Sequence, residues 1–246
     1  MLTDEARRYL PRAENTIRGK GEKLFRLLAY DVWRRELSRF GRRQKDQRLR
    51  VVDVGCGPGF LLGCIAHWFP SAELIGVDQS EDLLEVAQSR CRTMTALKGD
   101  ASRIPLPDGS ADAAFALHVV EHLKQPEVFF AEARRVVRPG GLLVVATPNL
   151  DGLGSRLMKE KWSGYSDPTH ISLHGESFWA EMFDRAGFDI AHRGTTGLSG
   201  IPVLKRMPLG LLHWIPTFIC GYFPWKLGEA CICVGVRRAE EGAHAH

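Results

Sequence analysis

Residues 51–60 read Val-Val-Asp-Val-Gly-Cys-Gly-Pro-Gly-Phe, an apolar run that stops in a glycine-rich turn. The residues that follow, 61–69, have the pattern of a helix. A buried strand that leads through a tight loop into a helix N-terminus suits an adenosine-type ligand. The same pattern also fits a plain strand-to-helix turn. The loop is G-x-G-x-G, because Phe60 stands where a dinucleotide-binding loop has its third glycine.

Length and composition are those of a soluble globular protein. The chain has 246 residues, of which 44% are hydrophobic and 25% charged, enough for one α/β domain with embellishments or two small domains. Its first eight residues are polar and lack the apolar centre of a secretory signal. The six cysteines show no C-x-x-C and no framework spacing, which favours reduced thiols and a cytoplasmic location.

The charge is unevenly distributed along the chain. The net charge is +4, yet residues 34–50 alone hold eight Lys and Arg against two acids. Such a basic run could bind nucleic acid or an anionic membrane surface. It also fits a solvated helix end and linker, and no aromatic or groove-reading motif accompanies it. Nucleic acid is therefore an unlikely partner on the sequence alone.

Short apolar runs alternate with helical patterns from residue 50 onward. The expected strands are 51–54, 74–77, 95–97, 113–117 and 142–146, and the expected helices are 61–69, 81–92 and 126–137. The runs are continuously apolar, as in strands covered on both faces, so the sequence predicts a doubly wound, Rossmann-like parallel sheet. Ser80 is expected to cap the second helix. Residues 1–40 look helical and 41–48 read as a linker, which places an extension at 1–48 and the main domain at 49–246.

The alternation ends after Pro148. Residues 150–173 are polar and are expected to be loop, followed by a helix at 175–186 and strands at 188–191 and 230–236. An apolar insertion at about 194–229 contains nineteen residues without formal charge, 207–225, interrupted by prolines and glycines. A membrane span, an interfacial contact and a lid or acceptor pocket are all open for it. The pocket would be lined by Leu211, Leu212, Trp214, Ile215, Phe218, Tyr222, Phe223 and Trp225.

Three acids stand at the ends of consecutive expected strands: Asp53, Asp78 and Asp100. A carboxylate at Asp78 can accept both hydroxyls of a ribose whose other end lies on the glycine loop, although NAD enzymes place an acid there too. A carboxylate at Asp100 can accept an adenine amino group. Three acids at successive strand ends around one glycine loop are hard to explain as ordinary surface residues.

With these motifs the sequence resembles the class I S-adenosylmethionine-dependent methyltransferases. The matching segments are the loop at 51–59, Gly-Val-Asp at 76–78, Gly-Asp-Ala at 99–101, Pro-Leu-Pro-Asp at 105–108, Val-Glu-His at 120–122 and Arg-Val-Val-Arg-Pro-Gly-Gly at 135–141. The resemblance covers residues 49–150 closely and 165–190 more loosely. It implies a seven-stranded sheet with an antiparallel last strand, which fits 230–236, and S-adenosylmethionine as methyl donor.

The resemblance also implies the donor-binding residues. Gly55, Gly57 and Gly59 would lie under the methionine portion, Asp53 near its amino group, Asp78 on the ribose and Asp100 at the adenine. Cys56, Gln79, Ala101 and His118 complete the expected set.

The sequence His118-Val-Val-Glu121-His122 follows the fourth expected strand, where the methyl group should point. As a string it matches a metallopeptidase pattern, which does not fit a nucleotide-binding sheet. Ubiquinone-pathway O-methyltransferases and small-RNA 2′-O-methyltransferases look similar through this Glu-His pair, Thr-Pro-Asn at 147–149 and a later histidine like His170. In some of them an E-x-x-E-H string with a later histidine binds a divalent metal beside the acceptor hydroxyl. Here His118 replaces the first acid, which would favour an ion softer than magnesium. No residue is assigned as a metal ligand, and a metal at Glu121, His122 and His170 stays open as an alternative. His118, His122 and His170 are expected to act as base, to orient the acceptor or to be structural.

The sequence thus predicts a methyltransferase that acts on a hydrophobic or aromatic small molecule, with oxygen as the expected target. Three alternatives stay open. They are a nucleic-acid methyltransferase, a nicotinamide-dependent oxidoreductase and a member of the fold that binds the donor without transferring a methyl group.

Overall fold

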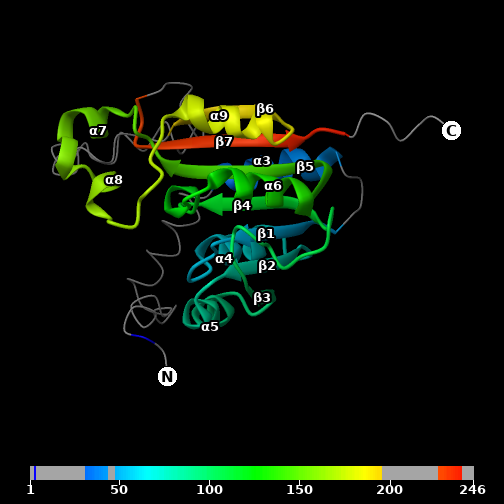
Figure 1. Cartoon of the computed structure of the whole chain (residues 1–246). Coiled ribbons are helices and arrows are strands. Elements are labelled where there is room, and N and C mark those ends of the chain that lie inside the picture. The colour runs from blue at the N-terminus through cyan, green and yellow to red at the C-terminus, as the bar shows by residue number, and fades with distance from the viewer. Residues whose placement is uncertain (1–2, 4–30, 44–47, 196–226, 240–246) are drawn as a thin grey trace.

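The computed structural model describes residues 3, 31–43, 48–195 and 227–239. They form a seven-stranded sheet in the order β3-β2-β1-β4-β5-β7-β6 (Figure 1). The strands are β1 (Arg50–Val54), β2 (Glu73–Asp78), β3 (Met94–Lys98), β4 (Ala111–Leu117), β5 (Val137–Pro148), β6 (Phe188–Thr195) and β7 (Ala230–Arg237). Strands β1 to β5 pair in parallel, and β7 lies antiparallel between β5 and β6. The predicted doubly wound sheet with an antiparallel last strand is confirmed.

Helices cover both faces of the sheet (Figure 1). On one face α3 (Asp31–Arg43), α4 (Phe60–Trp68) and α5 (Glu81–Arg90) enclose one hydrophobic core. On the other face α6 (Pro126–Val136) and α9 (Glu176–Arg185) enclose a second core, rich in phenylalanine and tryptophan. The central strands are buried on both sides, which explains why their sequences are continuously apolar.

Local sequence signals set most element boundaries. Helix α4 begins directly after Gly59, whose φ of 72° no β-carbon-bearing residue adopts readily. Helix α5 has Ser80 as N-cap, because the Leu83 amide donates to its hydroxyl at 3.3 Å. Pro126 opens α6, where its missing N–H costs nothing. These elements match the sequence prediction within a few residues.

Two expectations about loops are wrong. The segment 150–173 contains α7 (Leu153–Met158), a 3₁₀ turn η2 (Lys159–Lys161) and α8 (Ser163–Ser166). Its short helices are held by one buried side chain, Trp162, whose indole Nε1 donates to Glu229 Oε1 at 2.6 Å. Such a long-range anchor leaves no periodic pattern in the local sequence. Helix α3 also continues through Gly41 to Arg43, three residues into the expected linker.

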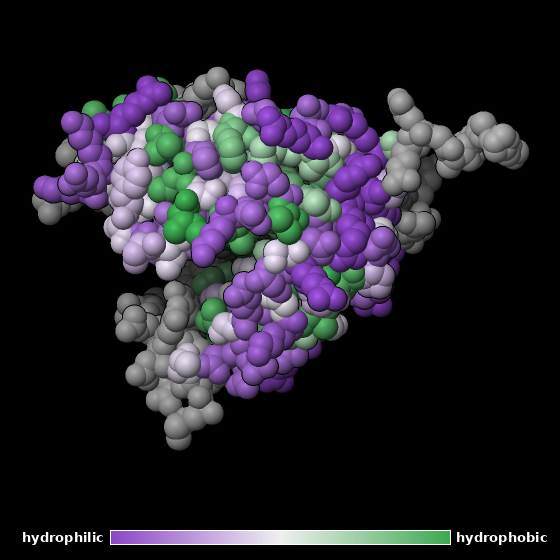
Figure 2. Space-filling model, in the orientation of Figure 1, coloured by the Kyte–Doolittle hydropathy of each residue, from purple (hydrophilic) through white to green (hydrophobic). Residues whose placement is uncertain are grey.

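The α7–α8 segment lies beyond the carboxyl ends of β4 and β5, at one end of the molecule (Figure 1). Figure 2 shows an apolar patch on the part of the face where α8 leads into α9, and Ile171 of this stretch is 54% exposed. The insertion 196–226, including the proposed pocket residues, lies outside the described residues. Within the described part of the chain, no helix is both long and apolar enough to cross a bilayer.

Candidate active site

The glycine loop after β1 offers an open cradle at the carboxyl edge of the sheet. The amides of Gly55 and Cys56 donate to the Val77 carbonyl at 2.7 and 3.0 Å, which ties the loop to β2. Gly57 has φ +50°, and a β-carbon there would meet no atom of the described residues within 4 Å. The space in front of Gly57 is therefore free for a ligand that approaches the main chain closely.

The other two loop glycines are required by packing. A β-carbon on Gly59 would come within 2.8 Å of Ala87 Cβ in α5, and one on Gly55 within 2.5 Å of Val119 Cγ2. The contact at Gly55 brings the stretch after β4 against the loop. The site thus lies between β1 and β4, where the strand order reverses, which is the usual binding crevice of doubly wound sheets.

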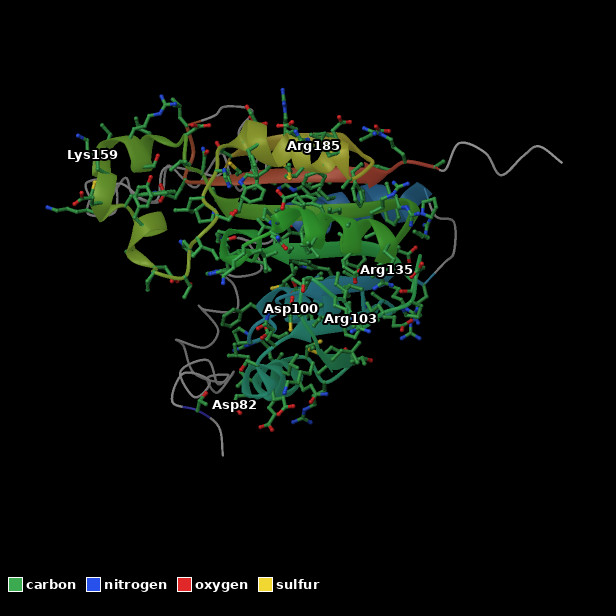
Figure 3. The ribbon with its side chains drawn as sticks, viewed as in Figure 1. Asp82, Asp100, Arg103, Arg135, Lys159 and Arg185 are labelled. Carbon is green, nitrogen blue, oxygen red and sulfur yellow. The ribbon has the colours of Figure 1, made fainter. Side chains whose placement is uncertain are left out.

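Asp78 and Asp100 lie at neighbouring strand ends and are already oriented by hydrogen bonds. Asp78 Oδ2 accepts from the Gly57 amide at 2.8 Å, and its Oδ1 accepts from the Ser80 amide at 2.9 Å. Asp100 Oδ1 accepts from the Ser102 amide at 2.7 Å. Hydrogen bonds from the Ser102 side chain and from this amide hold the pKa of Asp100 below its usual value. Gln79 Nε2 donates to Asp100 Oδ2 at 2.7 Å. Figure 3 shows Asp100 near Arg103, with which it forms a backbone bridge.

Asp53 is the deepest acid of the site. It sits in β1, paired with Gly76 of β2 and Phe115 of β4, and is only 4% exposed. Burial raises its pKa to about 8, and the nearby Asp78 carboxylate acts in the same direction. A positively charged ligand group beside this carboxyl would favour its ionised form, so the buried acid suits a cationic ligand group. The Cys56 side chain packs in the core below the loop, which leaves the main chain of Cys56 for ligand contact.

His118 follows β4 in an unusual conformation. Its φ is +58°, one of two positive values among the described non-glycine residues. Its backbone amide donates to the Ala146 carbonyl at 2.7 Å, and its ring Nδ1 lies 3.2 Å from Glu121 Oε1. The His118 side chain is 60% exposed, whereas that of Glu121 is fully buried.

His122 and His170 come together from segments far apart in the sequence. Their rings lie 4.8 Å apart between centroids. His122 Nδ1 lies 2.9 Å from Thr169 Oγ1, and His170 Nδ1 lies 2.7 Å from the Gly164 carbonyl oxygen. With Glu121 they form a group whose potential ligand atoms all lie within 4.8 Å of one another, a spacing that could hold an ion. Each Glu121 oxygen also faces one hydrogen-bonding partner within the protein, His118 Nδ1 and Thr147 Oγ1.

The structure therefore gathers the predicted residues into two neighbouring sets. The donor set surrounds the loop, and the histidine set lies after β4 and α8. Sequence reasoning missed Thr147 and Thr169, which hydrogen-bond to Glu121 and His122. The Thr-Pro-Asn motif was a signal for Thr147, but its partner could not be inferred from spacing.

The described arginines of the basic run mostly face acids of the same protein. Arg34 and Arg35 both pair with Asp31 at 2.6 Å, and Arg39 pairs with Glu36 at 2.7 Å. Arg50 pairs with Glu73 at 2.8 Å. These contacts are those of a folded helix and strand end rather than of an open phosphate-binding surface.

Comparison with known proteins matches the part of the chain that contains the glycine loop to a known family. Residues 52–145 match the methyltransferase domain family. A malonyl-[acyl-carrier protein] O-methyltransferase of Hahella chejuensis is 31% identical over 124 residues, covering 50% of this chain and 44% of the relative. Residues 52–145 thus carry the sequence and the fold of a class I S-adenosylmethionine-dependent methyltransferase domain. A probable S-adenosylmethionine-dependent methyltransferase of Mycobacterium tuberculosis is 35% identical over 102 residues, covering 40% of this chain and 35% of the relative.

The solved structures agree on the fold of this methyltransferase domain. A SAM-dependent methyltransferase from Archaeoglobus fulgidus superposes with a TM-score of 0.62 at 20% identity, covering 86% of this chain and 94% of that one. The chain spans about a third to a half of the length of the curated relatives that it matches. S-adenosylmethionine is the cofactor that the family implies, and the open cradle at Gly57 with the buried acid Asp53 fits it.

Proposed function

We propose that this protein transfers a methyl group from S-adenosylmethionine to a hydroxyl or carboxyl oxygen of an apolar small molecule. The observation that carries the donor half is the alignment of Asp53, Asp78 and Asp100 at adjacent strand ends around Gly57, where a β-carbon would meet no atom. The likeness to a malonyl-[acyl-carrier protein] O-methyltransferase supports oxygen as the target.

Each part of the chain would contribute through position and charge. Gly57 would let the methionine portion approach the main chain, Asp53 would face its amino group, and Asp78 and Asp100 would receive the ribose and adenine. When bound, S-adenosylmethionine supplies an electrophilic methyl group on a sulfonium. The protein then needs to align the acceptor oxygen, exclude water and remove a proton. Alignment alone can lower a barrier by roughly 7–11 kcal/mol.

The acceptor would enter from the side of the α7–α8 segment. Leu157, Tyr165 and Ile171 are exposed there at 62%, 50% and 54%, which favours an apolar acceptor. The aromatic insertion at 207–225 adds large apolar side chains of the same kind, although its placement lies outside the described residues. We propose that this insertion forms a pocket wall, a lid or a peripheral membrane contact. We also propose a cytoplasmic location for the protein.

A transfer assay tests the proposal. The protein is incubated with S-adenosylmethionine carrying a labelled methyl group and with panels of phenols, carboxylic acids and RNA. Label transfer to a phenol or a carboxylic acid is expected. Transfer to RNA alone would favour a nucleic-acid methyltransferase. Donor binding without transfer to any panel would leave a donor-binding protein and contradict the proposed activity.

A further inference from the structure

His118 holds an exposed imidazole in an unfavourable backbone conformation. A positive φ costs about 1 kcal/mol or more for a residue with a β-carbon, and such residues gather at functional sites. Here the conformation is held from two sides, by the hydrogen bond to the Ala146 carbonyl and by the contact with Glu121. The local fold therefore maintains this ring position against its intrinsic preference.

Glu121 is buried and hydrogen-bonded, unlike an ordinary surface acid. Its side chain is fully buried, and its Oε2 accepts from Thr147 Oγ1 of β5 at 3.0 Å. Its backbone carbonyl accepts from the amides of Ile171 and Ser172, both at 2.9 Å. The backbone of Glu121 is thus fixed by the stretch after α8 and its carboxylate by β5, and the remaining carboxylate oxygen, Oε1, lies against the His118 ring.

This arrangement selects one tautomer of His118. A carboxylate only accepts hydrogen bonds, so the His118 Nδ1 must carry the proton that faces Glu121 Oε1. In a neutral imidazole the lone pair then lies on Nε2. Among the described residues no hydrogen bond reaches Nε2, and most of the ring is exposed. The nitrogen that can accept a proton is the one available to a ligand.

We propose that His118 is the general base of the transfer and that Glu121, held by Thr147, is the residue that positions it. The inference rests on the proposed function. As the acceptor oxygen forms its bond to the methyl carbon, the carbon–sulfur bond breaks with its electron pair going to sulfur. The hydroxyl proton passes to His118 Nε2, and Glu121 stabilises the resulting imidazolium through Nδ1.

The other two histidines lack this support. His122 Nδ1 faces the Thr169 hydroxyl, which itself donates to Asp167, and His170 Nδ1 donates to a backbone carbonyl. His170 Nε2 also lies 3.8 Å from Asp167 Oδ2, but the Asp167 side chain is 45% exposed. Within the described residues, neither ring is therefore hydrogen-bonded to a buried carboxylate that would balance a positive charge as Glu121 does at His118. We therefore assign His122 and His170 to shaping the acceptor side of the site.

The direct test is the tautomer of His118 in the Glu121→Gln variant. The glutamine oxygen can still accept from Thr147, but its amide N–H groups would face Nδ1 and force the proton to Nε2. Nitrogen NMR of ¹⁵N-histidine-labelled protein distinguishes the two forms. We expect Nδ1–H in the unmodified protein and Nε2–H in Glu121→Gln. Glu127→Gln, on the exposed side of α6, is the matched control and should leave the signals of His118 unchanged.

Turnover gives a second and separate readout. With S-adenosylmethionine and the phenol panel, Glu121→Gln should lower kcat by about 10²–10⁴-fold. Its affinity for S-adenosylhomocysteine should stay within about twofold of the unmodified protein. His118→Asn is the second variant, because asparagine tolerates a positive φ, and it should lose activity to the same degree.

Two results would overturn the inference. One is an unchanged His118 tautomer in Glu121→Gln. The other is stoichiometric binding of Zn²⁺ that disappears in the same variant, because the carboxylate would then serve an ion. Failure of the unmodified protein to bind S-adenosylhomocysteine would instead refute the proposed function and leave the tautomer result standing.

Discussion

At the scale of single residues, Asp53 makes the stability of the fold depend on pH, and we propose that it also contributes to donor binding. Its folded-state pKa of about 8 lies far above the ordinary value of 3.8, so the folded protein favours the neutral acid. A group with a raised pKa stabilises the fold fully below the unfolded value, and this contribution is lost as the pH rises through the folded value. Ionisation of Asp53 therefore destabilises the ligand-free protein progressively between about pH 4 and pH 8.

Asp53→Asn should remove this contribution to the pH dependence of stability. The variant and the unmodified protein should unfold at similar temperatures near pH 4. At pH 8 the variant should be more stable, by about 2–4 °C for each kcal/mol gained. Its affinity for S-adenosylhomocysteine should fall about tenfold or more, because the amino group loses a charged partner. Thermal unfolding from pH 4 to pH 8, with and without ligand, measures both effects, and an equal stability gain at every pH would count against the buried-acid account.

The loop glycines should separate into a binding glycine and a packing glycine. Gly57→Ala adds a β-carbon to open space, so its stability cost should be about 1–2 kcal/mol of backbone strain while ligand affinity falls sharply. Gly59→Ala has a similar φ but forces its β-carbon against Ala87, so it should cost a further 1–3 kcal/mol or so. Denaturant unfolding and calorimetry of each variant give the comparison. Equal stability losses in Gly57→Ala and Gly59→Ala would contradict the claim that contact with Ala87 adds a cost at Gly59.

At the scale of elements, the α7–α8 segment depends on its contact with the start of β7. Trp162 and Ser163 both donate to Glu229 Oε1, at 2.6 and 2.9 Å. Asn149 Nδ2 donates to the Gly228 carbonyl at 2.8 Å, so the residue before the segment is bonded to the neighbour of Glu229. The α7–α8 segment, which we propose forms the acceptor side of the site, is thus attached beside β7 through contacts that do not involve the glycine loop.

Trp162→Phe tests this independence. It keeps most of the buried ring but removes the donor to Glu229, which should destabilise the segment by about 1–3 kcal/mol. Hydrogen exchange should rise across 150–173, and S-adenosylhomocysteine affinity should not change. The control is Tyr165→Phe, an exposed aromatic whose hydroxyl should matter by no more than about 0.5 kcal/mol. Loss of donor affinity in Trp162→Phe would show that the two sides of the site are coupled.

The elements also show what the sequence could and could not predict. Strands β1 to β5 and the position of Asp53, Asp78 and Asp100 at one edge of the sheet were predictable, because apolar runs and strand-end residues are local signals. The α7–α8 helices were not, since their stability comes from Trp162 meeting a residue 67 positions away. The pairing of Glu121 with Thr147 was likewise hidden, because it depends on the register that brings η1 (Val120–His122) to β5. Local patterns therefore predicted the donor side better than the acceptor side.

At the scale of the whole molecule, four described arginines of the basic run are paired with acids of the same protein. The arginines at 34, 35, 39 and 50 pair with acids of α3 and β2. Lys159, at the far end of the α7–α8 segment, lies apart from these arginines (Figure 3). A concentrated phosphate-binding surface is not expected from this distribution.

The protein should accordingly bind polynucleotides weakly. Gel shifts with a duplex DNA and a single-stranded RNA, at salt concentrations from 50 to 200 mM or so, should show no tight complex. Engagement of several phosphates would instead give a slope of about −0.9 per contact on duplex DNA and about −0.7 on a single strand. Tight and steeply salt-dependent binding would favour the nucleic-acid alternative.

The central claim is that S-adenosylmethionine binds at the carboxyl ends of β1 to β3, and calorimetry of Asp78 tests it most directly. Asp78 links the loop amide of Gly57 to the start of α5. The unmodified protein should bind S-adenosylhomocysteine and not NAD. Asp78→Ala should bind it about tenfold or more weakly, since a hydrogen bond to a charged group is worth roughly 1.5–3 kcal/mol, while Glu85→Ala on exposed α5 should not differ. Unchanged affinity in Asp78→Ala, or tighter binding of NAD, would contradict the account.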